Sequence, residues 1–365
     1  MSATHAIDLE DTGGLLAADR DGLLRAASSA GAQVRAIAAA ADEGDLDSLR
    51  VEERPRSIIW VAGRGAAETA GTMLAATLGG AASEPIVLAG DAPAWVGPLD
   101  VLIVAGDDPG DPGLVSAAAT GVRRGARVVV VAPYAGPLRD STAGRAAVLA
   151  PRLWVPDEFG LCRYLAAGLA VVRTVDPRPG IDLGSLADEL DAEALRNSAA
   201  RELFTNPAKM LAARISDAQV ALAGDCAATL ALARHGSSVL LRLAREVVAA
   251  TGLADAMVAL RAAGSAGGAS VDALFHDEEI DGPLPERLLV LAFTLADEQA
   301  VVAARTAGLD DVYLLAAEDV PDGPGGSAGS EVSPALGGPI SAEQQLAVLA
   351  VRLEMAAVYM RLVRG

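Results

Sequence analysis

Cysteine is scarce in this sequence, and its scarcity limits the chemistry that can be expected. The only two cysteines, Cys162 and Cys226, each stand alone among apolar residues. Isolated cysteines of this kind argue against a disulfide framework and a thiolate metal site, and they suit a reducing compartment. We therefore predict a cytoplasmic protein in which both thiols are packed in the core.

Aromatic residues and positive charges are also few. Aromatics make up 3% of the 365 residues, and 29 Lys and Arg stand against 48 Asp and Glu, which gives a net charge of -19. Such a charge repels a polyanionic backbone, and no long basic run or stacking aromatic offsets it, so nucleic acid is not expected as a partner. No charge-free apolar run approaches the roughly 20 residues of a membrane span, and the acidic first residues do not predict a signal peptide.

The sequence does contain β-branched runs that alternate with alanine-rich helical stretches. After a helical preface predicted for residues 1–50, near-continuous apolar runs predict a parallel sheet buried on both faces within a first domain, residues 51–176. The predicted strands are 57–61, 86–88, 101–105 and 128–132, with crossover helices at 66–78 and 113–124.

A length of 365 residues exceeds the roughly 250–300 at which a single core stops growing, which favours two domains. The Pro-Gly break at 176–180 follows an apolar helix predicted for 160–175, and a second α/β domain is predicted for residues 181–365. After a helix near 185–201, its strands are predicted at 218–223, 288–293 and 312–315. Ser341 and Gln344 form a capping-box pattern ahead of a last helix with one apolar face, which carries Leu346, Leu349, Leu353, Ala357 and Met360.

Two loops follow predicted strands, where doubly wound sheets bind ligands. Gly63-Arg64-Gly65 follows the first strand and opens a helix, so its backbone and Arg64 are candidates for anion binding, with a plain tight turn as the alternative. The loop after the third strand, Gly106 to Gly113, carries three carboxylates. We favour N-capping by Asp111 over cation binding for this loop.

Two titratable residues of the second half are candidates for proton transfer. Glu246 falls in a helix predicted for 238–250, and His276 precedes Asp277 and Glu278. A carboxylate and an imidazole are the groups that proton transfer beside a carbonyl needs. The alternative interpretations are an ion pair between Glu246 and Arg242 and a histidine with no role in catalysis.

The order of several motifs resembles the bifunctional phosphoglucose/phosphomannose isomerase family, which has two sugar isomerase (SIS) domains in tandem. The strand and glycine loop from Ile58 to Gly65 stand where the family has its own, and Gly125 to Val130 matches the approach to its fourth strand. The most specific matches are Asn-Pro-Ala-Lys at 206–209 and His276-Asp277-Glu278. The resemblance implies an α/β fold of two SIS-type doubly wound parallel-sheet domains with flanking helices.

The same resemblance implies an enediol reaction that converts glucose 6-phosphate or mannose 6-phosphate into fructose 6-phosphate. It assigns proton transfer to Glu246, ring opening to His276 and substrate binding to Arg163 and to the loop of Gly63, Arg64 and Gly65. It implies a homodimer, a sugar-phosphate ligand, and no metal or nucleotide cofactor. The rival interpretation is a non-catalytic binder or regulator that kept the SIS fold, and the acidic, hydroxyl-poor loop of 106–113 favours it.

Overall fold

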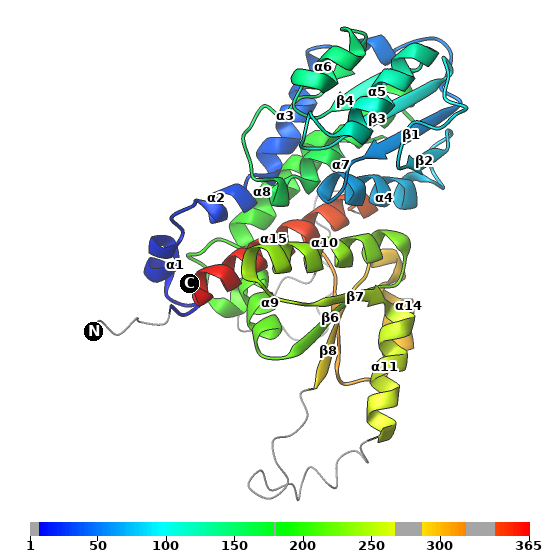
Figure 1. Ribbon diagram of the computed structural model, residues 1–365. Coiled ribbons are helices and arrows are strands. Elements are labelled where there is room, and N and C mark those ends of the chain that lie inside the picture. The colour runs from blue at the N-terminus through cyan, green and yellow to red at the C-terminus, as the bar shows by residue number, and fades with distance from the viewer. Residues whose placement is uncertain (1–6, 179, 267–286, 319–339) are drawn as a thin grey trace, which may run out of the picture.

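Two parallel sheets organise the chain (Figure 1). This computed structural model describes residues 7–178, 180–266, 287–318 and 340–365. In these residues the first sheet has the order β2-β1-β3-β4-β5 and the second the order β7-β6-β8-β9, and every neighbouring pair is parallel. The strands are β1 Ser57–Ala62, β2 Ile86–Ala89, β3 Asp100–Ala105, β4 Arg127–Val131, β5 Ala146–Val148, β6 Gln219–Gly224, β7 Ala249–Gly252, β8 Leu288–Phe293 and β9 Val312–Leu315.

The two sheets share a topology over four strands, which confirms the predicted fold class. In each, the first strand lies between the second and the third, and the fourth follows the third. β5 and β7 are additions to the predicted strands. The helix predicted for 238–250 is wrong at both ends, because the observed helix α10 spans Ala227–Ala244 and β7 begins at Ala249.

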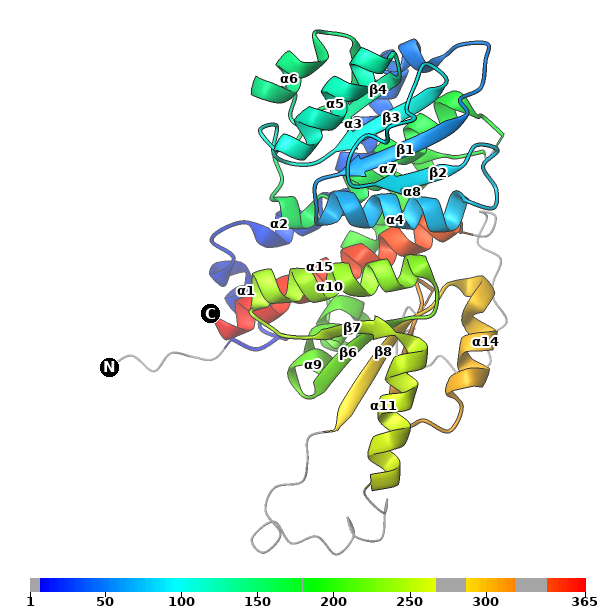
Figure 2. The same cartoon turned by 45° about the vertical axis from the view of Figure 1, so that its right-hand side comes forward.

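Helices cover both faces of each sheet (Figure 2). α5 and α6 lie on the outer face of the first sheet, α11 and α14 lie on the outer side of the second, and α4, α10 and α15 lie between the sheets. The helices are α1 Thr12–Ala18, α2 Leu23–Ala27, α3 Ala30–Asp42, α4 Ala66–Leu78, α5 Pro112–Arg124, α6 Gly136–Thr142, α7 Leu161–Val175, α8 Leu183–Arg196, α9 Pro207–Ser216, α10 Ala227–Ala244, α11 Leu253–Ala266, α14 Ala296–Thr306 and α15 Ala342–Arg364, with short 3-10 turns at η1 Asp47–Leu49, η2 Asp157–Phe159 and η3 Leu203–Thr205.

The strands have apolar residues on both faces, and this pattern sets the layers. In β1, Ile58 and Trp60 face the helices between the sheets, whereas Ile59 and Val61 face the layer of α5. Successive side chains of a strand point to opposite faces, so a continuous apolar run is buried only when both faces are covered. The largest buried cluster joins residues of both sheets to those of α4, α7, α10 and α15, so the two sheets share one helical core.

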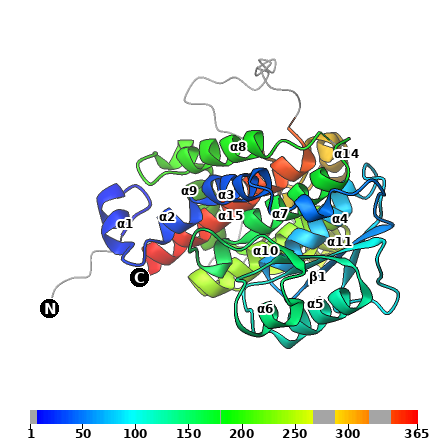
Figure 3. The same cartoon turned by 90° about the horizontal axis from the view of Figure 1, so that it is seen from above.

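The last helix is more deeply buried than its sequence pattern predicts. α15 begins with the predicted capping box, in which Ser341 accepts from the Gln344 amide and the Gln344 side chain accepts from the Ser341 amide. Its middle is buried on all sides, including Arg352 and Glu354, so the prediction of a single apolar face is too narrow. Seen from above, α15 runs beneath α3 and beside α7 and α10 (Figure 3).

The prediction that both cysteines are packed in the core holds for one of them. Cys162 on α7 is fully buried, as predicted. Cys226 is only half-buried, because it caps the start of α10 beside Thr229. Both thiols are free.

Candidate functional site

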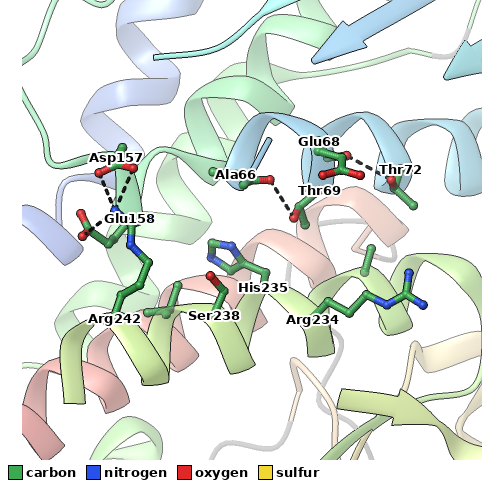
Figure 4. A pocket seen from close by; sticks show the side chains of 13 residues that line it. Ala66, Glu68, Thr69, Thr72, Asp157, Glu158, Arg234, His235, Ser238 and Arg242 are labelled. Carbon is green, nitrogen blue, oxygen red and sulfur yellow. Dashed lines mark hydrogen bonds and ion pairs between the residues drawn. The ribbon is translucent and has the colours of Figure 1, made fainter. Parts of the chain in front are cut away.

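A cleft opens where the carboxyl ends of β1 and β3 meet the face of α10. It consists of two adjoining cavities of about 520 Å³ and 210 Å³ that share the side of η2 and the start of α4. The larger one is lined by the loops that follow β1 and β3, and the smaller one lies between α4 and α10 (Figure 4). Ligands of doubly wound sheets bind at this edge, so the fold places a candidate site here.

The predicted glycine loop forms one wall of the cleft. Gly63, Arg64 and Gly65 are exposed and line the larger cavity. Gly65 has φ 65°, a left-handed conformation that favours glycine, and α4 starts at the next residue without a side-chain cap. The first amides of a helix have no acceptor within the helix. Arg64 makes no ion pair within the described residues, so free amides and a free guanidinium stand together.

The acidic loop forms the opposite wall, and two of its three carboxylates have a partner within the loop or the helix that follows it. Asp111 accepts from the amides of Gly113 and Leu114 at the start of α5, which confirms the predicted N-cap. Asp108 accepts from the Gly110 amide. The structure therefore explains two of the three carboxylates as turn and cap residues.

The third carboxylate, Asp107, is held by α7. It accepts from Arg163 Nη2 at 2.8 Å and from the Tyr164 hydroxyl at 2.6 Å. Arg163 is 8% exposed and lies behind the loop, so it reaches the cleft through Asp107 and does not line it. Burial raises the pKa of the Tyr164 hydroxyl far above its usual range, which keeps this group a hydrogen-bond donor.

Glu246 lies outside both cavities. α10 ends at Ala244, Arg245 adopts φ 54°, and Glu246 follows in the connection to β7. Its Oε2 is 2.5 Å from Arg364 Nη2 near the end of α15. The prediction of an ion pair between Glu246 and Arg242 is therefore wrong. Arg242 instead pairs with Asp157 and Glu158, each at 2.9 Å. His276 lies outside the described residues.

A histidine that the sequence analysis did not single out lies in the cleft. His235 on α10 lines the smaller cavity, and its Nε2 is 2.9 Å from Glu354 Oε1 on α15. The side chains are 4% and 1% exposed. Burial raises the pKa of the Glu354 carboxyl above its ordinary value, and the hydrogen bond from His235 partly opposes that shift.

Comparison with known proteins shows the fold. No family model matches the chain, and no curated protein matches it. The solved structure of tagatose-6-phosphate ketose/aldose isomerase from Escherichia coli is 15% identical, with a TM-score of 0.58, and the match covers 100% of this chain and 94% of the other. The C-terminal domain of glucosamine-fructose-6-phosphate aminotransferase from Francisella tularensis is 11% identical, with a TM-score of 0.57, covering 94% and 96%. The chain therefore has the fold of SIS-domain phosphosugar isomerases.

The cleft of this SIS fold combines two kinds of surface. At the start of α4, Arg64 and the amides that have no acceptor within the helix offer donors to an anion, whereas Asp157, Glu158 and the acidic loop line the rest of the cleft with hydrogen-bond acceptors. Carboxylates accept hydrogen bonds from hydroxyl groups. The arrangement suits a ligand with one anionic end and several hydroxyls.

No metal site and no membrane span were found in the part of the chain that the structure describes. There, no three His, Cys, Asp or Glu side chains come together in a way that would hold a metal ion. None of the described helices combines the length and apolarity needed to cross a bilayer.

The buried pair of His235 and Glu354 had only a weak signal in the sequence. Glu354 and Arg352 are the two charged residues of the otherwise mostly apolar run from Leu346 to Met360, and a charge in a buried helix requires a partner. That partner is 119 residues away in sequence, so spacing alone does not identify it.

Proposed function

We propose that the protein binds a sugar phosphate in this cleft and interconverts its aldose and ketose forms. The observation that carries the proposal is the uncapped start of α4 beside Arg64, which makes no ion pair with any residue that the structure describes, at the carboxyl edge of the first sheet. The Escherichia coli protein of the same fold is, by its description, a ketose/aldose isomerase of a sugar phosphate. That description supports the substrate class and the reaction type proposed for this chain.

The phosphate is assigned to the start of α4. The positive end of the helix dipole and the free amides after Gly65 favour a dianion there, and Arg64 adds charge-assisted hydrogen bonds. The sugar hydroxyls then face the carboxylates that line the rest of the cleft, among them Asp157, which borders both cavities. Because Arg64 is exposed, its attraction is screened by salt, and we expect affinity to fall as ionic strength rises.

The reaction proposed is the conversion of glucose 6-phosphate or mannose 6-phosphate into fructose 6-phosphate through an enediol. The family resemblance assigns proton transfer to Glu246 and ring opening to His276, and both assignments stay predictions. Proton transfer between adjacent carbons requires a base, an acid and oriented donors, so the proposal includes no cofactor.

A non-catalytic sugar-phosphate binder is the second candidate, and one contact favours it. Asp107 already accepts hydrogen bonds from Arg163 and Tyr164, so an internal carboxylate takes up donors that a ligand oxygen would otherwise engage. A protein of this kind binds hexose phosphates without turning them over.

A paired measurement tests binding and turnover. Thermal shift and calorimetry with glucose 6-phosphate measure binding, and NMR in deuterated water measures deuterium incorporation at C2. Arg64→Ala should weaken binding about tenfold, since a charge-assisted hydrogen bond contributes about 1.5 kcal/mol. Arg139→Ala, an exposed arginine on α6, is the matched control and should not change affinity. Binding without deuterium exchange favours the second candidate, and no binding refutes both.

The proposal also covers the oligomeric state, the partners and the location of the protein. We propose a cytoplasmic homodimer that does not bind nucleic acid, in agreement with the two free thiols and the net charge of -19. Light scattering after size-exclusion chromatography measures the oligomeric state directly.

A further inference from the structure

We propose that His235 is the group that accepts and returns the proton of the bound sugar, and that Glu354 positions it. This inference rests on the proposed isomerisation and names the base that would perform it. It starts from the one buried histidine-carboxylate pair among the described residues, which borders the smaller cavity.

The imidazole has one nitrogen engaged and one free. Nε2 is bound to Glu354 Oε1 at 2.9 Å, and Nδ1 has no hydrogen-bond partner among the described residues. Figure 4 shows the ring in the space between α10 and α4, close to Ser238. When Glu354 is a carboxylate it accepts from Nε2–H, and the lone pair on Nδ1 is then available as a base.

Glu354 is too deeply buried to be explained as a surface charge. It is 1% exposed in the middle of α15, next to the apolar residues Leu353 and Met355. A buried ionised carboxylate is costly unless it is paired, and His235 is its only hydrogen-bonding partner in the described residues. Burial therefore keeps Glu354 paired with His235, and His235 borders the cleft.

The cleft supplies charges of both signs around His235. Glu68 on α4 and Asp157 and Glu158 of η2 line the same cavity, and α10 itself contributes Arg234 and Arg242. Asp157 and Glu158 are bound to Arg242, so their charge is partly neutralised.

The position of His235 agrees with the phosphate site proposed at the start of α4. Gly65 and Ala66, at the start of α4, line both cavities, and His235 and Thr69 line the smaller one. A hexose phosphate anchored at the start of α4 can therefore extend its sugar end along α4 towards His235.

The chemistry balances with these residues. Nδ1 takes the proton from C2, the C2–H bonding pair becomes the C1=C2 double bond, the π pair of the C1=O1 bond moves onto O1, and O1 takes up a proton to give the enediol. The imidazolium then returns its proton to C1 while the C2 hydroxyl loses its proton and becomes the ketone. The proton that O1 gains matches the one that O2 loses, and the hydroxyls of Ser238 and Thr69 in the same cavity can relay it.

The first experiment compares deuterium incorporation into fructose 6-phosphate by wild type, His235→Gln and Glu193→Gln. His235→Gln should lose exchange by about 10²- to 10⁴-fold, which is the contribution of one general base. Glu193→Gln is the matched control, because Glu193 is equally buried but pairs with Arg352 away from the cleft, and it should retain exchange. Equal exchange in wild type and His235→Gln overturns the inference alone, whereas no exchange in wild type overturns the proposed reaction and the inference together.

The second experiment begins with the wild-type protein, so its first measurement does not depend on how any variant folds. Nitrogen-15 NMR of the wild-type histidines should show a proton on Nε2 of His235 and none on Nδ1, and fructose 6-phosphate should shift the Nδ1 signal. Glu354→Leu should shift the balance between the two tautomers, and a variant with only a structural defect would leave it unchanged. An Nδ1 signal that does not move at saturating ligand overturns the inference.

Discussion

The middle of α10 and the connection that follows this helix provide two candidate bases in contrasting surroundings. In the middle of α10, His235 is buried, pairs with Glu354 of α15 and borders the cleft. Just beyond α10, Glu246 is 24% exposed, pairs with Arg364 of the same α15 and lines neither cavity. Both residues pair with α15, but one titratable group lies at the cleft and the other near the surface.

The difference shows that a residue's place in the sequence identifies a candidate base less well than its burial beside a cavity does. An exposed ion pair contributes little, because water and salt screen it. A buried pair costs desolvation energy and breaking it is strongly destabilising, so its presence at a cavity wall requires an explanation. Four predictions test this comparison.

The largest effect on stability is expected from a substitution that disturbs the packing of α10 next to His235. A Cβ at Gly236 would lie 2.9 Å from Leu222 Cδ1 and 3.0 Å from Leu353 Cδ1, so α10 approaches β6 and α15 closely at this point. Gly236→Leu should lower the free energy of unfolding by about 1–3 kcal/mol through overpacking. Urea unfolding measures it, and Arg234→Leu, at an exposed position of the same helix, should change it by less than about 0.5 kcal/mol. Equal effects of the two variants would show that this contact is not tight.

The second effect is the dependence of folding stability on pH that the buried pair of His235 and Glu354 produces. The pKa of Glu354 in the folded protein is raised above 4.5, so the folded state binds its proton more tightly than the unfolded state does. The stability this gives is complete below about pH 4.5 and is lost as the pH rises through the folded pKa. Unfolding of wild type and Glu354→Gln from pH 4 upwards should show wild type losing stability relative to the variant. A difference that is constant or moves the other way contradicts this.

The strand pattern of both sheets was largely predictable because the predicted strands are near-continuous apolar runs, and those of the first sheet are also rich in β-branched residues. Val128 to Val131 is typical of such a run. β5 and β7 were missed because their sequences, Ala-Ala-Val and Ala-Ala-Thr-Gly, resemble those of the alanine-rich helices. The same ambiguity extended α10 beyond its end and placed Glu246 on a helix.

The candidate site was predictable only in part, because parts of it depend on contacts between distant segments. The loop Gly63 to Gly65 follows a predicted strand, so its place at the sheet edge follows from topology. By contrast, Arg163 and Asp107 are 56 residues apart, and their ion pair removes Arg163 from direct contact with the cleft. Sequence spacing gives no information on such a contact.

The third effect concerns the C-terminal end of α10. Arg245 is the C-cap of the helix and has φ 54°, a conformation that costs a residue with a Cβ about 1 kcal/mol. Arg245→Gly should therefore raise the free energy of unfolding by about 0.5–1 kcal/mol. Asp217, the C-cap of α9 with φ -98°, is the matched control, and Asp217→Gly should be neutral or destabilising. If both glycine variants destabilise the protein, left-handed strain at Arg245 is not significant.

The smallest effect is expected at Glu246 itself, and this prediction separates the two candidate bases. Its carboxylate is 2.5 Å from Arg364, and the two side chains are 24% and 40% exposed, so Glu246→Gln should change the free energy of unfolding by at most about 1 kcal/mol. If His235 is the base, the same variant retains deuterium exchange, because Glu246 lines neither cavity. If the family resemblance assigns the base correctly, exchange falls by about 10²- to 10⁴-fold while binding is retained. NMR of exchange, with calorimetry of fructose 6-phosphate binding on the same sample, distinguishes the two. A large loss in Glu246→Gln together with full activity in His235→Gln would assign the base to Glu246, in the connection between α10 and β7.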